Sequence, residues 1–477
     1  MRARWPVSAF VLLCASSGTC AAPATSDGAR AIAQKYAEYF SQAVVDKGIV
    51  AVTPGGDDYV VTWDLQKGLE LAGLPPGAVH IERFSYELSP QEDGGWRVKA
   101  DRLPNIAFDA PTGKGRISGA FDLGRFNFQA TFAAGRRDFL RSIAAADAVN
   151  AQLRVDDPPQ RVGVVLGQAG VSAETRAKIA EGGAGVDVAI AQSTKHWTEI
   201  FLSTSEGGSP ITLEYEAPGA ANGLAIAGLR AREIGELWKF VVAHPDEHDA
   251  QAMKARVRAA LPLWKDIHAQ TEIRDLNLTS PTVEARLKAL DETLGFTGFV
   301  ENGSAEFGVR VEDCTFKSAL LPSWATALSP VSLNLDLRIA AKGLDQAARL
   351  ALDDPNFLEK GRISPETEGK IKRLGEPRII LSPGRLTTPL IDLTFEGEAA
   401  VEGGAASASF TIGADSLDKT TALIQDIMKS DPDAQSIALG MALIKGLATN
   451  GPDGRLLWRI DVSPDGDVSI NGTPLGK

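Results

Sequence analysis

The most suggestive group of reactive side chains is His244, Glu247 and His248, in the stretch HPDEH. It matches the H-x-x-E-H pattern of one class of zinc peptidases, in which two histidines on one helical face bind Zn²⁺ and the glutamate activates a water molecule. Pro245, however, belongs in the first turn of the following helix, which can leave His244 off the helical face. No pattern for a third ligand follows. We therefore assign no metal site and keep a zinc-dependent hydrolase only as an alternative.

The other reactive residue types are scattered along the chain. His80, His196 and His268 each stand alone in the sequence and are expected on the surface of a strand or helix. No serine lies in a nucleophile-elbow pattern, and the stretch 111–115 lacks the residue order of a phosphate-binding loop. Cys314 has no neighbouring histidine and lies in an alternating stretch, where core packing is expected. The sequence therefore predicts no catalytic residue, no cofactor and a protein that is not an enzyme.

The first 24 residues have the three parts of a secretory signal peptide. Arg2 and Arg4 supply the positive start, and the apolar stretch 5–15 is shorter than the ~20 residues of a membrane-spanning helix. Small residues then supply a cleavage site, which we place after Ala24; an uncleaved anchor is the alternative. We expect residues 1–24 to be removed and no membrane-spanning segment in the mature chain.

Composition limits the choice of partners. The formal net charge is −12, and removal of Arg2 and Arg4 would make the chain more acidic still. Such a surface repels phosphate backbones, so nucleic acid is not expected as a partner. Cys14 and Cys20 lie in the signal, which leaves Cys314 alone and allows no internal disulfide. The fold must therefore be held together by burial of an apolar core, in more than one lobe.

Most of the chain alternates apolar and polar residues, as expected for a sheet with one wet face. Ser26 can cap a helix, and the stretch from Ile49 to Leu65 then predicts a hairpin around a Pro-Gly-Gly-Asp turn. Residues 246–269 are interpreted as a helix interrupted at Pro262.

An alternating strand followed by a helix occurs four times, beginning near residues 125, 222, 331 and 406. The copy near 331, VSLNLDLRIAAKGLDQAARLALDDP, is the clearest, and RFNFQATFAAGRRDFLRSIAAAD near 125 is the weakest. The irregular spacing excludes a tight solenoid. Either a sheet-forming unit was duplicated, or these are ordinary strand-helix junctions.

These patterns predict an α+β fold: an extended, curved, mainly antiparallel β-sheet built from repeated strand-helix units, with helices packed on the sheet. We divide the chain into a signal peptide at 1–24, a β-rich lobe with a leading helix at 25–206, and a β-rich lobe with the strand-helix units at 207–477. The boundary falls in a stretch rich in Gly, Pro and Ala.

Several turn-and-strand phrases are similar to those of a known group of proteins. TPGGDDYVVTWDL, LSPQEDGGWRVKADRLP, IAFDAP, GRISGAFD and DVSINGTPL resemble a family of uncharacterised alphaproteobacterial exported proteins and, more distantly, the YdgA-like and AsmA-like envelope proteins. The resemblance covers the first ~130 mature residues and the last ~25 best, and it carries over no site residue. It implies the periplasm of a Gram-negative bacterium and a sheet whose concave face holds apolar groups.

Three functions follow as expectations. The first is a non-catalytic periplasmic protein that binds a hydrophobic ligand, such as a lipid, or an envelope protein along its sheet. The second is a structural spacer in envelope assembly. The third is the zinc-dependent hydrolase of His244, Glu247 and His248.

Overall fold

A computed structural model describes residues 23–477, apart from 72, 133–138, 206–209, 244–249, 322–327, 361, 416, 428–439, 441, 452–453 and 476–477. The described part of the chain belongs to the α+β class and is mainly antiparallel sheet, as predicted. It divides into two compact units, which we call unit 1 (residues up to Trp264) and unit 2 (Lys265 onward). The predicted boundary at 206/207 falls outside the described residues, and it separates two strands, β12 (His196–Ser205) and β13 (Ile211–Ala217), that pair with each other inside unit 1.

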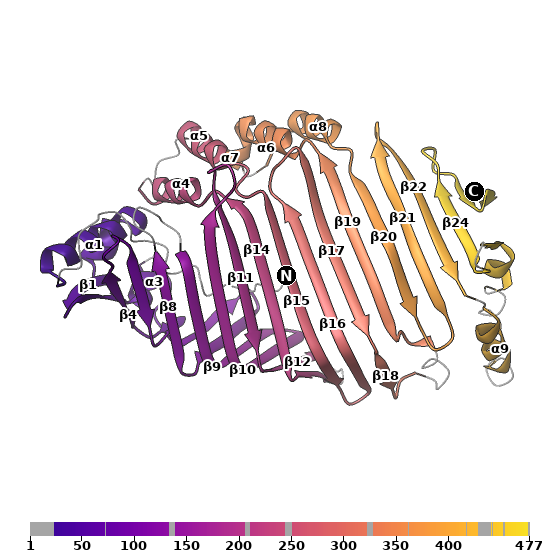
Figure 1. Ribbon diagram of the computed structural model, residues 1–477, viewed down its shortest axis with the longest axis horizontal. Helices are drawn as coiled ribbons and strands as arrows, with labels where there is room; N and C mark the ends of the chain where they lie inside the picture. Colours follow the sequence, from indigo (N-terminus) through magenta and orange to yellow (C-terminus); the bar gives the residue numbers. More distant parts are fainter. Residues whose placement is uncertain are drawn as a thin grey trace. The chain divides into compact units, whose positions relative to one another are not determined.

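Unit 1 begins with a helix packed on a small sheet (Figure 1). Helix α1 (Ser26–Phe40) covers β1 (Val50–Gly55) and β2 (Asp58–Trp63), which form the predicted hairpin. The side chains of β2 alternate between the core and solvent as predicted, since Tyr59, Val61 and Trp63 are all buried. The helix begins one residue earlier than predicted: the side chain of Thr25, and not that of Ser26, accepts the hydrogen bond from the N–H of Gly28.

The core of unit 1 lies between α1 and the sheet. The ring of Trp63 meets Tyr36 and Phe40 edge-on, at centroid distances of 5.5 Å and 5.3 Å. Leu88 and Val98 are almost completely buried beside them. This side of the sheet continues through β4 (Phe84–Pro90), β5 (Trp96–Ala100) and β8 (Phe126–Phe132).

A long hairpin then divides the unit 1 sheet into two branches. It is formed by β9 (Phe139–Asp157) and β10 (Gln160–Ile179), paired over almost their whole length except at Gly170, which has a φ of 60°. In one branch, β9 pairs with β8, and β10 pairs with β11 (Val186–Thr194), which in turn pairs with β14 (Gly219–Leu229). In the other branch, β9 pairs with β7 (Gly115–Leu123), which is followed by β6 (Ile106–Thr112) and β3 (Val79–Ile81). On the side of β10, the same branch continues through β12 and β13.

The start of β9 corrects one prediction. The weakest strand-helix copy placed a helix over RDFLRSIAAAD, but the described residues of this stretch are strand. Alanine favours a helix in isolation. Here the segment hydrogen-bonds to β8 on one side and β10 on the other, and these pairings override its local preference.

The remaining helices of unit 1 follow β14. Helix α4 (Ala231–Ala243) packs against α1: the indole N–H of Trp238 donates to the carbonyl oxygen of Tyr39 at 3.1 Å. The predicted helix over 246–269 is only partly correct. Helix α5 (Ala250–Ala260) stops before Pro262, which has no N–H to continue it, and Asp266 already begins a strand. Residues 246–249 lie outside the described part.

Unit 2 is an antiparallel meander of long strands (Figure 1). Each strand pairs with the next one along the chain except at short edge elements. The strands are β15 (Asp266–Thr279), β16 (Val283–Thr297), β17 (Asn302–Glu312), β18 (Thr315–Ser318), β19 (Ser332–Lys342), β20 (Arg378–Thr387), β21 (Asp392–Glu402), β22 (Ala405–Ala414), β23 (Thr449–Asn450), β24 (Leu456–Val462), β25 (Val468–Ile470) and β26 (Thr473–Leu475).

Three helices of unit 2, those that follow β19, form a small group in which the first contacts the other two. Helices α6 (Leu344–Asp353), α7 (Pro355–Lys360) and α8 (Pro365–Leu374) follow β19 and lie beyond the strand ends in Figure 1. Helix α9 (Asp418–Ile427) follows β22. A strand is thus followed by a helix at three of the four predicted positions, after β14, β19 and β22.

Unit 1 also contains shorter helices. They are α2 (Gln42–Asp46) and α3 (Leu65–Leu71), both in unit 1. Leu65, predicted to close the strand of Trp63, starts α3 instead. No helix among the described residues is long and apolar enough to cross a membrane.

Candidate functional site

Two neighbouring rows of side chains on one face of the unit 2 sheet are apolar from strand to strand. Directly opposed residues share a face of an antiparallel sheet, so the strand register shows which side chains line up. Two such rows cross seven strands, from β16 to β24, and we call them together the apolar face. The first row is Leu294, Phe307, Leu337, Leu381, Gly397, Phe410 and Ile460; the second is Phe296, Ala305, Ile339, Ile379, Ala399, Ala408 and Val462.

Large side chains of the apolar face remain in contact with solvent. Leu294 is 49% exposed, Phe307 44% and Ile339 45%. A sheet normally buries its apolar side against a second layer. Here neither row contains a charged or hydrogen-bonding side chain, and at a strand spacing of about 4.8 Å the seven strands span roughly 29 Å. The apolar face can therefore hold a long hydrocarbon group.

Glycine provides room for an aromatic ring within this face. A Cβ built on Gly397 would lie 2.4 Å from the ring of Phe410, so the ring lies directly over the glycine backbone. Any larger residue at position 397 would displace the ring. The Phe410 ring therefore covers the backbone at Gly397 with apolar surface.

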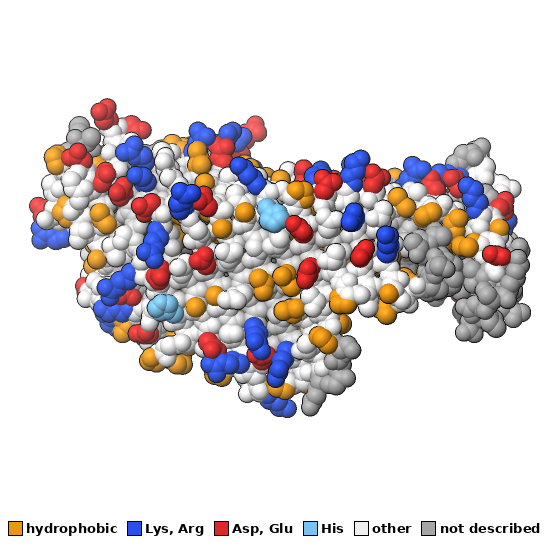
Figure 2. Space-filling model, turned by 90° about the horizontal axis from the view of Figure 1, so that it is seen from below, with side chains coloured by type: hydrophobic (Ala, Val, Ile, Leu, Met, Phe, Trp, Pro, Cys, Tyr) orange, Lys and Arg blue, Asp and Glu red, His pale blue; other side chains and the backbone are white. Residues whose placement is uncertain are grey.

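The opposite face of the same strands is charged. Arg274 pairs with Asp291, and Arg338 pairs with Glu306 at 3.3 Å. The neighbouring carboxylate raises the pKa of the Arg274 guanidinium above its ordinary value. In the space-filling view, acidic and basic side chains are interspersed over the surface seen from below, with hydrophobic side chains among them (Figure 2). The two faces of these strands thus differ sharply in chemistry.

A second feature lies in unit 1, in the branch of the sheet that contains β6, β7 and β12. One face of this branch is hollowed. The hollow has a volume of about 680 Å³, within the range of ligand pockets. Alternate residues of β6, β7, β9, β10 and β12 line it through their side chains, and Gly163 lies between them on β10. These side chains are Asp109, Ser118, Ala120, Gln152, Arg154, Arg161, Val165, Leu202 and Thr204.

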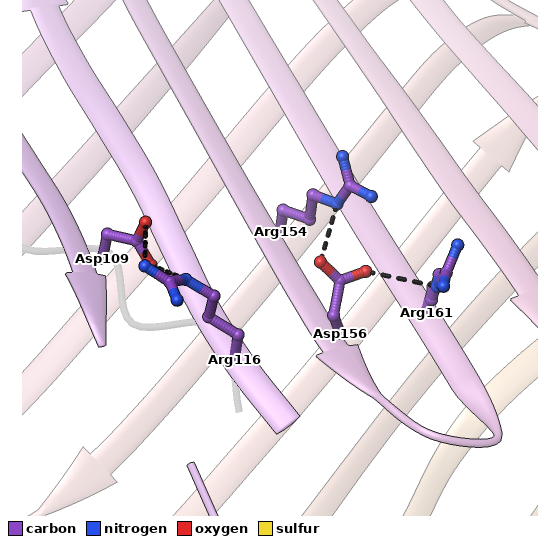
Figure 3. A network of polar contacts seen from close by, with 5 residues as sticks. All are labelled: Asp109, Arg116, Arg154, Asp156 and Arg161. Carbon is purple, nitrogen blue, oxygen red and sulfur yellow. Dashed lines mark hydrogen bonds and ion pairs between the residues drawn. The ribbon is translucent and has the colours of Figure 1, made fainter. Parts of the chain in front are cut away.

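Charged side chains gather at this hollow (Figure 3). Arg116 binds both carboxylate oxygens of Asp109, with Nη2 at 2.8 Å from Oδ2, and this contact lowers the pKa of the Asp109 carboxyl. Asp156 is shared: Nε of Arg154 donates to its Oδ2 at 3.0 Å, and Nε of Arg161 lies 3.6 Å from its Oδ1. Three guanidinium groups therefore face two carboxylates.

Of the reactive residues singled out from the sequence, those that the structure describes lie in neither the apolar face nor the hollow. His244, Glu247 and His248 lie outside the described residues, so the zinc alternative stays untested there. His80 and His196 lie on β3 and β12 of unit 1, and His268 lies on β15 of unit 2; each is exposed, and His196 is 3.9 Å from Glu216. Within the described part of the chain, no cluster of His, Cys, Asp and Glu could hold a metal ion.

Cys314 also differs from expectation. It is half-buried in the link between β17 and β18, not inside a strand, and its N–H donates to the carbonyl oxygen of Val331. Burial raises the pKa of its thiol. The side chain is therefore kept in the unreactive protonated form, in agreement with a packing role.

Sequence reasoning expected an apolar side of the sheet but identified the residues of neither feature, for different reasons. The alternation in LNLDLRI predicted the strand β19 but not that its apolar side would stay exposed. The charged group had a weak signal in DDPPQR, since a Pro-Pro turn after Asp156 brings Arg161 opposite it. Comparison of the chain with known protein families, with characterised proteins and with solved structures finds no match.

Proposed function

We propose that this chain is a non-catalytic binding protein of the bacterial periplasm that holds lipid acyl chains on the apolar face of unit 2. The observation that supports this most is the exposure of Leu294, Phe307 and Ile339 in rows that contain no polar side chain. Exposed apolar patches of this kind mark binding surfaces in folded proteins.

The chemistry of the face favours a hydrocarbon over a protein partner. A protein interface of useful affinity carries about one hydrogen bond per 100–200 Å². The two rows offer only apolar side chains, which match a group without donors or acceptors. One acyl chain fills about half of the ~30 Å hydrocarbon core of a bilayer, so the roughly 29 Å width of the rows is long enough for it.

The proposed location in the periplasm is argued separately from the binding function. It rests on the signal-like pattern of residues 1–24 and on the resemblance to exported envelope proteins. Expression in a Gram-negative host, followed by cell fractionation and mass determination of the mature chain, tests it. Recovery of the intact chain from the cytoplasm would contradict it.

The binding function is tested by a pair of polar substitutions. Phe307→Gln with Ile339→Gln places two amides in the middle of the apolar face, on adjacent strands. We expect roughly tenfold weaker binding of the fluorescent fatty acid cis-parinaric acid, since a factor of ten corresponds to about 1.4 kcal/mol of lost apolar contact. The amount of lipid that co-purifies with the variant is also expected to fall.

The matched control lies on the other face of the same two strands. Glu306→Gln with Arg338→Gln removes an exposed ion pair next to each altered position, and we expect affinity within twofold of the unaltered chain. The proposal is rejected if the unaltered protein binds no parinaric acid and carries no lipid, or if both pairs of substitutions have the same effect.

A further inference from the structure

The hollow in unit 1 has the features of a second, different binding site. Its charged group is asymmetric: Arg116 is engaged by both oxygens of Asp109, whereas Arg154 and Arg161 share the single carboxylate of Asp156. One positive charge is therefore left over in the group. Arg154 and Arg161 are also the more accessible partners, with side chains 63% and 68% exposed against 31% for Asp156.

The orientation of the two guanidinium groups leaves donors available for a ligand. Both approach Asp156 through Nε, from opposite sides (Figure 3). The terminal nitrogens of Arg154 point away from that carboxylate. Arg–phosphate pairs favour contact through two parallel N–H groups of one guanidinium. Asp156 thus acts as a positioning residue that holds two cations a short distance apart.

The same hollow also offers an apolar surface. Arg154, Gly163 and Leu202 are directly opposed on β9, β10 and β12, so the glycine leaves a gap between the guanidinium and the leucine. Leu202 and Val165 are each 42% exposed at this gap. A ligand here would meet guanidinium groups at one end and aliphatic side chains at the other.

We propose that this hollow binds a phosphate group carried on an apolar chain, with Arg154 and Arg161 holding the phosphate and Val165 and Leu202 contacting the chain. A phosphate suits the site because its several oxygens can accept hydrogen bonds from two guanidinium groups at once. The site lies wholly in unit 1, so it is separate from the apolar face of unit 2 and goes beyond the function proposed for that face.

The test compares three probes on the full chain by isothermal titration calorimetry: octyl phosphate, 1-octanol and inorganic phosphate. We expect octyl phosphate to bind at least tenfold more tightly than either of the others. Arg154→Gln with Arg161→Gln is expected to remove its advantage over octanol. Equal binding of octanol and octyl phosphate would overturn the proposal, and so would binding of inorganic phosphate as tight as that of octyl phosphate, because the apolar chain would then contribute nothing.

Two further variants separate binding from folding. Gly163 has ordinary backbone angles, and an added Cβ would meet Leu202 only at 3.5 Å, so Gly163→Leu can fill the gap without disturbing the strand. It is expected to weaken octyl phosphate roughly tenfold. Arg125→Gln, which breaks a single exposed pair with Asp147 outside the hollow, should leave affinity unchanged. If Gly163→Leu and the arginine pair both bind octyl phosphate like the unaltered chain, the hollow is not the site.

Repeating the titrations in the Phe307→Gln, Ile339→Gln background separates the two proposals. The preference for octyl phosphate over octanol should persist there, since the altered residues lie in unit 2. A preference that depends on the unit 2 substitutions but not on the arginines overturns this inference and leaves the acyl-binding function standing. A preference that depends only on the arginines supports the inference even if parinaric acid binding fails.

Discussion

At the scale of single residues, the Asp354 carboxylate makes several hydrogen bonds inside unit 2. It lies between α6 and α7 and is only 3% exposed. Its Oδ2 accepts from the N–H and the hydroxyl of Ser364, and its Oδ1 accepts from the N–H of Asn356. These bonds, the Ser364 hydroxyl foremost, hold the pKa of Asp354 far below its ordinary value.

Replacement of Asp354 by Asn should destabilise unit 2 in a pH-dependent way. A carboxyl with a depressed folded pKa stabilises the fold fully above its unfolded pKa of about 3.9, and this contribution declines below that value until it is lost as the pH falls through the folded pKa. We therefore expect Asp354→Asn to lower the thermal midpoint more at pH 7 than at pH 3, and the loss to shrink further as the pH is lowered below 3. Asp465→Asn, at an exposed turn, is the control with no such difference. An equal loss at both pH values would show that the ionised carboxylate is not the source.

At the scale of elements, the contact of α4 with α1 joins segments about 200 residues apart. The Trp238 indole donates to Tyr39, and Lys239 reaches both Glu38, at 3.4 Å, and the ring of Tyr39, at 4.2 Å. The pKa of Glu38 is lowered, first by its hydrogen bond with Lys35 and also by Lys239. Directional contacts of Trp238 and Lys239 therefore dock α4 on α1, while Arg256 of α5 lies over the ring of Phe240 on another part of α4.

Trp238→Phe tests that docking. It keeps an aromatic ring but removes the N–H donor, so we expect a loss of about 1 kcal/mol in the local stability of α4. Hydrogen exchange should show faster exchange of residues 231–243, with β2 and β4 unchanged. Val241→Ala on the same helix, at a 40% exposed side chain, should have a smaller effect. Faster exchange throughout the sheet would contradict a purely local role.

At the scale of the whole molecule, the two units differ in how they bury apolar groups. Unit 1 has a closed core under α1, with Leu88 only 2% exposed. Unit 2 has a smaller buried cluster of Ala414, Leu417 and Trp458, and its apolar face stays open. This difference predicts that damage to the core of unit 1 acts mainly on unit 1.

Leu88→Ala should remove about 3 kcal/mol of stability, as expected for a buried leucine whose site cannot collapse. Hydrogen exchange is the appropriate measurement, because it resolves the two units. We expect faster exchange in β2, β4 and β5 and little change in β16–β21. Glu87→Ala, on the solvent side of the same strand, serves as the control. Equal acceleration in both units would mean that they unfold as one.

Local patterns in the sequence determined much of the element content. The alternation in DYVVTW and LNLDLRI predicted β2 and β19, because a strand turns successive side chains to opposite faces. The Ala-rich start of β9 was wrongly predicted as helix, since only its pairing with β8 and β10 makes it a strand. The start of α1 was misplaced by one residue for a different reason, because the side chain of Thr25 and not that of Ser26 caps the helix.

The sequence by itself therefore determined the class of fold, the acidity of the chain and most of its strands, all of which depend on composition and short-range periodicity. Only the tertiary structure decided that seven strands align Leu294, Phe307 and Leu337 with their neighbours in open rows. It also decided that Arg154 and Arg161 converge on Asp156. Strand register is set by pairing between distant segments, and no local pattern in one sequence encodes which residues will face each other across it.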